Sequence, residues 1–187
     1  MRHTAIRSKV APEITQLADE LGVVFADAGI PDIAGRILGW LLVSDPPEQS
    51  LEELRIATRA SKASISTMTR LLHHLGFIER SGSNETRSTL YKLRDDPWTS
   101  FSEKRLETTR RLVKLASQAE ASLSWMPATR RRRVEQMSEF WAFVLDRNES
   151  LIDEWKRSRA DSDSRLRRST NLSKIRKRQL AKSEAAN

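Results

Sequence analysis

The chain lacks cysteine entirely and contains few glycines and prolines. The absence of cysteine excludes disulfide bonds, thiolate metal sites and cysteine nucleophiles, and it is compatible with a reducing cytoplasm. Because six glycines, six prolines and 38% hydrophobic residues are spread over 187 positions, we expect one compact domain with extensions, long enough to bury a core.

Long apolar segments are also missing. The longest uninterrupted apolar stretch covers residues 37–43, and the first ten residues contain basic side chains with no apolar run behind them. We therefore expect neither a signal peptide nor a membrane span, and no contact with a membrane.

Motifs for catalysis are absent too. The sequence contains no glycine-rich phosphate loop, no HExxH pattern and no Gly-x-Ser-x-Gly turn. Its histidines are His3, His73 and His74. Adjacent residues on a helix point about 100° apart, so His73 and His74 cannot chelate a metal without other ligands. We expect no enzyme activity, no metal and no cofactor.

Two amphipathic helices are expected at the start of the chain. Apolar residues at helical spacing mark residues 11–28, which end at Gly29, and a second helix over residues 32–43 begins with Asp32 as its cap. Residues 1–29 are therefore assigned to an N-terminal helix.

The following segment predicts two short helices joined by a tight turn. A helix over residues 51–58 is followed by a turn over residues 59–61 and a second helix over residues 62–75. Ser61 is a suitable N-cap for the second helix, and Gly76 is a suitable C-cap.

A β-hairpin is predicted directly after the second helix. Strands over residues 77–81 and 86–93 flank a turn around Gly82. Two helices, a turn and a hairpin in this order predict a winged helix-turn-helix domain over residues 30–95, which is a device for reading DNA. The expected fold is mainly α with a small β-wing.

The outward face of the second helix carries unusually short residues. Alanine, serine and threonine side chains let a helix enter a major groove and still offer hydrogen bonds to base edges, whereas an ordinary exposed helix more often carries Glu and Lys. We expect Thr67 and Arg70 to read bases and Lys62 to contact phosphate. The predicted DNA-binding residues are Ser61, Lys62, Ser64, Ser66, Thr67, Arg70, Arg80, Asn84 and Arg87.

Four segments resemble signatures of the GbsR branch of MarR-type bacterial regulators. They are GRILGWLL at residues 35–42, SDPPEQS at 44–50, ASKASIS at 60–66 and LGFIER at 75–80. The resemblance implies a homodimeric repressor that binds a palindromic operator, with the second helix in the major groove and the wing in the neighbouring minor groove.

The wing follows the family pattern in one part and departs from it in another. MarR-type wings usually carry an acid, a spacer and an arginine, and Glu85-Thr86-Arg87 fits this pattern. Many GbsR-like wings have a Pro-Gly-Glu-Arg type of turn, whereas this chain has Ser-Gly-Ser-Asn at residues 81–84.

A helical hairpin is expected after the wing, over residues 96–159. Pro97 suits the first position of a helix that reaches about Trp125, and Pro127 separates it from a helix over residues 129–159. The last helix carries apolar residues at alternating spacings of three and four, as in a coiled-coil seam, and we expect it to mediate dimerisation. The seam residues are Val134, Met137, Trp141, Val144, Asn148, Leu151 and Trp155.

Two features of the expected helices, one in the last helix and one spread along the chain, leave alternatives open. Asn148 either fixes the register of the paired helices or turns toward a solvated edge. The five tryptophans suggest an aromatic pocket for an inducer, since aromatic cages bind quaternary ammonium ions, although aromatic stripes at helical spacing are more often core. The expected pocket residues are Trp40, Trp98 and Phe101.

The C-terminal residues 160–187 form a basic tail. Residues 158–187 contain nine Lys and Arg against three acids, a net charge of +6, which leaves 8 − 6 = +2 for the rest of the chain. The tail is either an electrostatic arm for phosphates or a poorly ordered end that aids solubility.

The sequence as a whole predicts a dimeric, sequence-specific DNA-binding transcriptional regulator of the bacterial cytoplasm and nucleoid. A repressor that a small-molecule inducer releases is the expected form. The alternative is a non-specific architectural DNA-binding or protein-interaction module that relies on the basic tail.

Overall fold

The computed structural model describes the backbone of residues 12–82 and 89–184, and the side chains within it up to residue 162 together with that of Ser164. The chain divides into two compact units, residues 1–105 and 106–187. The elements in order are α2 (Pro12–Asp27), α3 (Asp32–Val43), β1 (Gln49–Ser50), α4 (Leu51–Thr58), α5 (Lys62–His74), β2 (Ile78–Gly82), β3 (Thr89–Leu93), α6 (Pro97–Ser122) and α7 (Ala128–Glu184). No helix among the described residues is long and apolar enough to cross a membrane.

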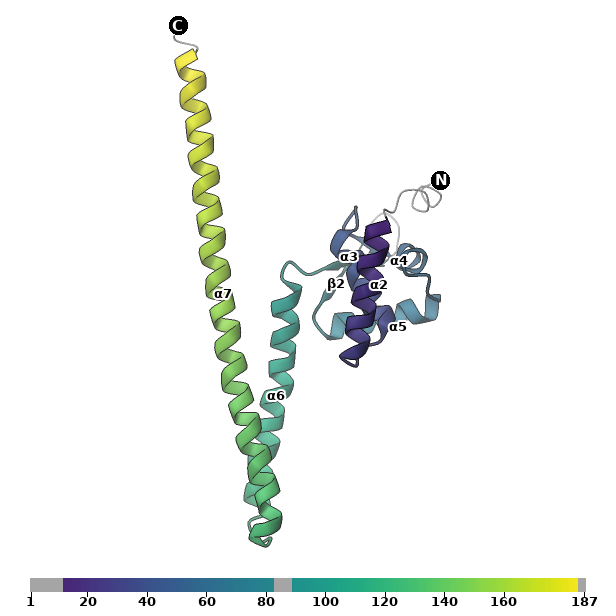
Figure 1. The fold of residues 1–187 in the computed structure, drawn as a ribbon, viewed down its shortest axis with the longest axis vertical. Helices are drawn as coiled ribbons and strands as arrows, with labels where there is room; N and C mark the ends of the chain where they lie inside the picture. Colours follow the sequence, from purple (N-terminus) through teal and green to yellow (C-terminus); the bar gives the residue numbers. More distant parts are fainter. Residues whose placement is uncertain (1–11, 83–88, 185–187) are drawn as a thin grey trace. The chain divides into compact units, whose positions relative to one another are not determined.

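The first unit is built on a close crossing of α2 and α3 (Figure 1). A Cβ atom on Gly35 would lie 2.5 Å from the carbonyl oxygen of Leu21, and one on Gly39 would lie 2.6 Å from the Cα atom of Ala18. The two helix backbones therefore approach more closely than larger side chains would allow. This crossing places the apolar side of α3 against α4 and α5.

The first unit also contains a three-stranded antiparallel sheet with the order β1-β3-β2. The sequence predicted only the hairpin of β2 and β3, and it missed β1, in which Gln49 pairs with Tyr91. A two-residue strand is too short to show an alternating pattern. The fully buried core contains Ile37, Leu38, Leu54, Ile65, Leu72, Phe77 and Ile78.

The cap predicted at the start of α3 is wrong. Pro31 occupies the N-cap position without a side-chain hydrogen bond, and Asp32 is the first helical residue. The Asp32 carboxylate lies 3.4 Å from the guanidinium of Arg36, which also lies 3.4 Å from Asp19 of α2. The carboxylate at this helix start thus takes part in an ion pair between helices and does not cap the backbone.

The second unit contains most of α6 and all of α7, which form an antiparallel hairpin. The Arg110 guanidinium donates to the carboxylate of Glu149 at 2.7 and 2.9 Å and joins the two helices. The last helix does not end near Arg159 as expected, because α7 continues to Glu184. Neither glycine nor proline occurs after Pro127, so no backbone signal stops the helix there.

Candidate nucleic-acid interface

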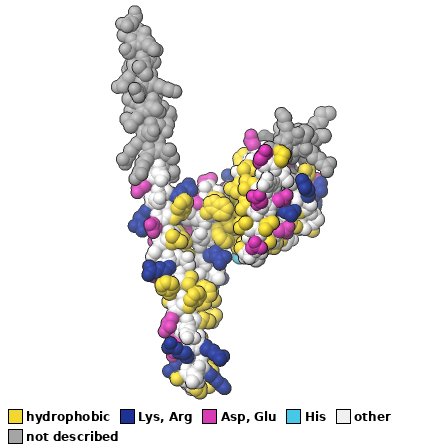
Figure 2. Space-filling model, in the orientation of Figure 1, with side chains coloured by type: hydrophobic (Ala, Val, Ile, Leu, Met, Phe, Trp, Pro, Cys, Tyr) yellow, Lys and Arg dark blue, Asp and Glu magenta, His cyan; other side chains and the backbone are white. Residues whose placement is uncertain are grey.

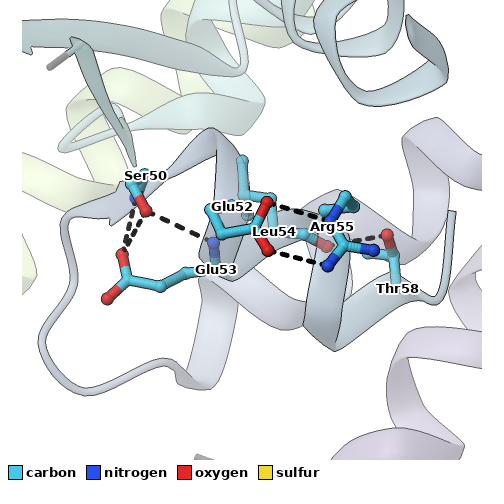
Figure 3. A network of polar contacts seen from close by, with 6 residues as sticks. All are labelled: Ser50, Glu52, Glu53, Leu54, Arg55 and Thr58. Carbon is cyan, nitrogen blue, oxygen red and sulfur yellow. Dashed lines mark hydrogen bonds and ion pairs between the residues drawn. The ribbon is translucent and has the colours of Figure 1, made fainter. Parts of the chain in front are cut away.

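The first helix of the helix-turn-helix, α4, begins with a complete capping box (Figure 3). The Ser50 hydroxyl accepts from the backbone N–H of Glu53 at 3.3 Å, and the Glu53 carboxylate accepts from the Ser50 backbone N–H at 2.7 Å. Two N–H groups that a helix start leaves unpaired are thereby satisfied. Glu52 binds Arg55 through two hydrogen bonds of 2.9 and 2.7 Å on the exposed side.

The turn between the helices is tight and starts with an unusual backbone conformation. Arg59 follows α4 with a φ of 56°, in the left-handed region. Ser61 then caps α5, as the sequence predicted, because its hydroxyl accepts from the Ser64 backbone N–H at 3.1 Å. These two residues set the point from which α5 leaves the turn.

The inner side of α5 determines which side chains face outward. Ile65, Thr69 and Leu72 are fully buried against the core. The Thr69 hydroxyl donates to the carbonyl oxygen of Ile65 at 2.9 Å, so this polar group is satisfied within the helix. A helix that is held by this stripe presents its opposite side to the surroundings.

The outer side of α5 carries the short residues and cations that the sequence assigned to DNA. Lys62, Thr67 and Arg70 are exposed, whereas Ser64 and Ser66 are half-buried. The Ser64 hydroxyl lies 2.9 Å from that of Ser61, so both serines take part in the start of the helix. No acidic residue occurs anywhere in α5.

Arg70 lies along its own helix in the free protein. Its Nε donates to the carbonyl oxygen of Ser66 at 3.2 Å, and one of its terminal nitrogens donates to the Thr67 hydroxyl at 3.4 Å. The two side chains expected to read bases are therefore adjacent and in contact.

The helix α5 ends at His74 with Leu75 as its C-cap, so the prediction of Gly76 as the C-cap is wrong by one residue. The residue that directly follows this cap is Gly76. Its φ of 88° lies in the left-handed region, and a Cβ atom there would meet the carbonyl oxygen of Ser100 at 3.0 Å. Phe77 follows and is stacked on Phe101, with ring centroids 4.4 Å apart, while Trp98 meets the Phe77 ring edge-on at 5.7 Å. The first turns of α6 therefore pack directly on the end of α5.

The three residues expected to line an inducer pocket occupy two environments. Trp98 and Phe101 surround Phe77, as described above. The indole N–H of Trp40 donates instead to the side-chain oxygen of Gln49 at 3.0 Å, next to strand β1. The inducer pocket itself stays a prediction.

The described part of the wing carries one of the three predicted DNA contacts. Arg80 in β2 is exposed and lies 6.0 Å from the ring centre of Tyr91. On the other face of the same strands, Lys92 forms a 3.2 Å ion pair with Glu79. Asn84 and Arg87 lie outside the described residues.

The apolar side chains of α7 divide between the inside of the hairpin and its surface. Of the seven residues predicted for dimerisation, Val134, Met137, Trp141, Val144 and Asn148 are half-buried within the single chain, while Leu151 and Trp155 are exposed. The amide of Asn148 donates to the carbonyl oxygen of Val144 at 2.9 Å, within its own helix. Ile152, which the seam did not include, is the buried residue of this turn.

One cation near the reading face was not singled out by the sequence. Arg59 is exposed and precedes Ser61 and Lys62 at the start of α5. The sequence analysis missed Arg59 because turn residues show no helical or strand periodicity. The only sequence signal for it was a single basic residue between two short predicted helices.

These features together define a class of protein. A capped helix-turn-helix, a small wing and a helical hairpin are the parts of a winged helix-turn-helix DNA-binding regulator.

Comparison with known proteins gives the family. A family model described as MmpR5-like MarR family transcriptional regulator matches residues 96–158. The HTH-type transcriptional regulator MmpR5 of Mycobacterium tuberculosis is 36% identical over 133 residues, which cover 71% of this chain and 81% of that protein. A crystal structure of a transcriptional regulator shares 33% sequence identity with a TM-score of 0.71, and the match covers 78% of this chain and 99% of the other.

The chain therefore belongs to the MarR family of transcriptional regulators. The predictions of a MarR-type regulator and of a mainly helical winged-helix fold are confirmed, and the family is one of DNA-binding regulators, not of enzymes. The matches concern the MmpR5-like group. Membership of the GbsR-like branch stays a prediction.

Proposed function

We propose that this protein is a dimeric, sequence-specific transcriptional repressor in which α5 enters the major groove and the wing contacts the adjacent minor groove. The observation that carries the proposal is the outer side of α5, which combines exposed Lys62, Thr67 and Arg70 with a complete absence of acidic side chains. Arginine makes bidentate hydrogen bonds to guanine, and threonine hydrogen-bonds base edges or contacts the thymine methyl group.

Phosphate contacts are assigned to the cations around this reading face. Lys62 and Arg59 lie at the start of α5, where the backbone N–H groups also favour an anion. Ser61, Ser64 and Ser66 hold or flank this end of the helix. Arg80, Asn84 and Arg87 are assigned to contacts of the wing.

Dimer formation is supported by apolar side chains that the single hairpin leaves exposed (Figure 2). In the second unit, Phe140, Phe143, Leu151 and Trp155 of α7 are each between 46% and 63% exposed. Exposed large apolar residues that recur along one helix mark a protein interface. A second copy of the chain would supply the twofold symmetry that a palindromic operator requires.

Release by a small-molecule inducer is the regulatory part of the proposal. Trp98 is 43% exposed and packs with Phe101 around Phe77, directly behind the end of α5. A ligand that repacks these rings would move the helix that reads DNA. The site of action is the bacterial nucleoid.

The proposal is tested by selecting bound fragments from genomic DNA with the full chain. We expect enrichment of a palindrome with half-sites about one helical turn apart, and a preference of about 10³-fold or more over scrambled DNA at physiological salt. Equal affinity for selected and scrambled duplexes would overturn sequence-specific regulation.

The alternative function, non-specific binding through the basic tail, is favoured by one observation. The backbone of residues 160–184 continues the helix α7, and this stretch contains eight Lys and Arg. A helix with this charge is suited to DNA phosphates.

Deletion of residues 160–187 distinguishes the two functions. If the tail contacts phosphates, the slope of log affinity against log salt flattens by about 0.9 for each lost contact. In a sequence-specific regulator, the ratio of operator to scrambled affinity survives this deletion. Loss of most affinity for both duplexes would favour the architectural function. An unchanged slope would show that the tail does not contact phosphates and would favour its alternative role in solubility. The control replaces Arg176, Lys177 and Arg178 by Gln and keeps the length of the helix.

A further inference from the structure

Three side chains form a row across one face of the sheet. The register pairs Gln49 of β1 with Tyr91 of β3, and the same Tyr91 with Arg80 of β2. Because directly opposed residues of antiparallel strands project from the same face, these three side chains follow one another across the sheet. Gln49 and Tyr91 are buried, whereas Arg80 on the edge strand is exposed. The row therefore leads from the core to the surface of the wing.

The buried end of the row is attached to α3. The side-chain oxygen of Gln49 accepts from the indole N–H of Trp40 at 3.0 Å, and its amide nitrogen donates to the carbonyl oxygen of Pro46 at 2.6 Å. Breaking these bonds would leave buried polar groups unsatisfied, which is unfavourable. Tyr91 belongs to the hydrophobic core against which Trp40 packs. Both residues are thus held in place through α3, the helix that also packs against α5.

The exposed end of the row is a guanidinium group that rests on an aromatic ring. The guanidinium carbon of Arg80 lies 6.0 Å from the centre of the Tyr91 ring, within the roughly 6 Å range of a cation–π contact. Among the described residues Arg80 forms no ion pair, and the neighbouring acid, Glu79, binds Lys92 on the opposite face. A ring contact restricts the guanidinium without using its N–H groups, which stay available for phosphate oxygens.

We propose that Tyr91 is a positioning residue of the DNA interface, which together with Gln49 holds the Arg80 guanidinium ready for a phosphate of the DNA backbone. The inference rests on the function proposed above, in which Arg80 contacts DNA from the wing. Tyr91 and Gln49 act through Arg80, because both are buried. They limit the conformations of the Arg80 side chain, so less conformational entropy is lost when it binds the phosphate.

A double-mutant cycle on DNA affinity tests this role with the full chain. The affinity for a random duplex is measured at several salt concentrations, because a phosphate contact does not depend on base sequence. Arg80→Gln should flatten the slope of log affinity against log salt by about 0.9. Tyr91→Leu should weaken binding about two- to fivefold, the range of an exposed cation–π contact. In the double variant, Tyr91→Leu should add no loss to that of Arg80→Gln.

Three further variants separate positioning from folding. Tyr91→Phe keeps the aromatic ring and should bind like the wild type. Lys92→Gln removes a cation from the opposite face of the same strands, and Tyr91→Leu should weaken binding in this background as much as in the wild type. Gln49→Met keeps the length of the side chain without its hydrogen bonds and should reproduce the effect of Tyr91→Leu.

A measurement on the wild type alone does not depend on the folding of any variant. The order parameter of the Arg80 Nε–H bond, determined by NMR relaxation in the absence of DNA, reports how far the side chain is restricted. It should exceed that of the exposed Arg132 of α7. Equal order parameters would show that the ring does not hold Arg80 and would overturn the proposal.

Two results of the cycle would also overturn it. Equal losses from Tyr91→Leu with and without Arg80 would show a structural role only, and an Arg80→Gln variant with wild-type affinity and slope would leave nothing to position. Wild-type affinity of Gln49→Met would overturn the part assigned to Gln49. Failure of the proposed function is seen separately, as a wild type without preference for selected over scrambled DNA, because the cycle uses a random duplex.

Discussion

At the scale of single residues, Thr67 and Arg70 are the pair on which sequence reading depends. They are hydrogen-bonded to each other on the exposed side of α5, so each helps to orient the other before DNA is bound. Pre-organised side chains lose less conformational entropy when they bind.

We expect Thr67→Ala and Arg70→Ala each to cost about 1 to 3 kcal/mol on the operator and much less on random DNA. The double variant should lose less than the sum, because the two side chains are in contact. Titrations of both duplexes with the four proteins measure this coupling. Lys62→Ala is the control and should weaken both duplexes equally; equal losses for the Thr67 and Arg70 variants on both duplexes would remove their base-reading role.

His73 predicts a pH dependence of stability. Its pKa in the folded protein lies below the ordinary value of 6.5, because of partial burial and then the charges of Arg80 and Arg94. Below pH 6.5 the unfolded chain binds a proton at His73 more readily than the folded chain does. The contribution of His73 to the free energy of unfolding is therefore fully present above about pH 6.5 and is lost as the pH falls.

Urea unfolding between pH 7.5 and 5 in phosphate-free buffer measures this effect. The unfolding midpoint of the wild type should fall more steeply with decreasing pH than that of His73→Gln. Arg94→Gln should show a weaker dependence than the wild type, because one of the causes is removed. Identical pH profiles for wild type and His73→Gln would contradict the assignment.

At the scale of secondary-structure elements, the α2–α3 crossing supports the DNA-binding unit. The helices meet at glycines, and an added methyl group would contact backbone atoms, which cannot rotate away as a flexible side chain can. The position of α3 in turn determines that of α5, since α3 packs against it.

Gly35→Ala is therefore expected to destabilise the protein by about 3 kcal/mol. The control is Gly82→Ala, because a Cβ atom at Gly82 meets nothing within 4 Å, and its effect should stay within about 0.5 kcal/mol. Urea denaturation of the two variants compares them directly. Equal stability of both variants would show that the helices can separate without cost.

At the scale of the whole molecule, the question is what covers the apolar side chains of the helical hairpin. Arg110 and Glu149 join the two helices, yet Phe140 and Leu151 of α7 are 57% and 63% exposed. These side chains stabilise little in the single chain, so they are the positions at which a dimer can be tested without unfolding the hairpin.

Replacing Phe140 and Leu151 together by Asp should yield a helical monomer, because two charges would have to be buried in the proposed interface. Sedimentation gives the mass, and circular dichroism confirms that helicity is kept. Ser150→Asp, on an exposed polar position, should remain a dimer. A folded monomer of the double variant that binds operator with wild-type affinity would show that the dimer is not the DNA-reading unit.

The sequence by itself determined the local elements that carry the function. The N-cap at Ser61 and the apolar stripe of α5 were predicted correctly because they depend on neighbours within a few residues, and the predicted C-cap at Gly76 lies one residue beyond the actual cap, Leu75. The resemblance of the central segments correctly indicated a MarR-type regulator.

Only the tertiary structure decided how these elements pair and which faces they bury. Strand β1 exists because Gln49 pairs with Tyr91, which lies 42 positions later in the chain. Asp32, which the sequence predicted as a helix cap, forms an ion pair with Arg36 instead. The periodicity of α7 could not separate buried Ile152 from exposed Leu151, because both belong to one broad apolar stripe. Contacts between distant segments depend on the path of the whole chain, and a local pattern contains no information about that path.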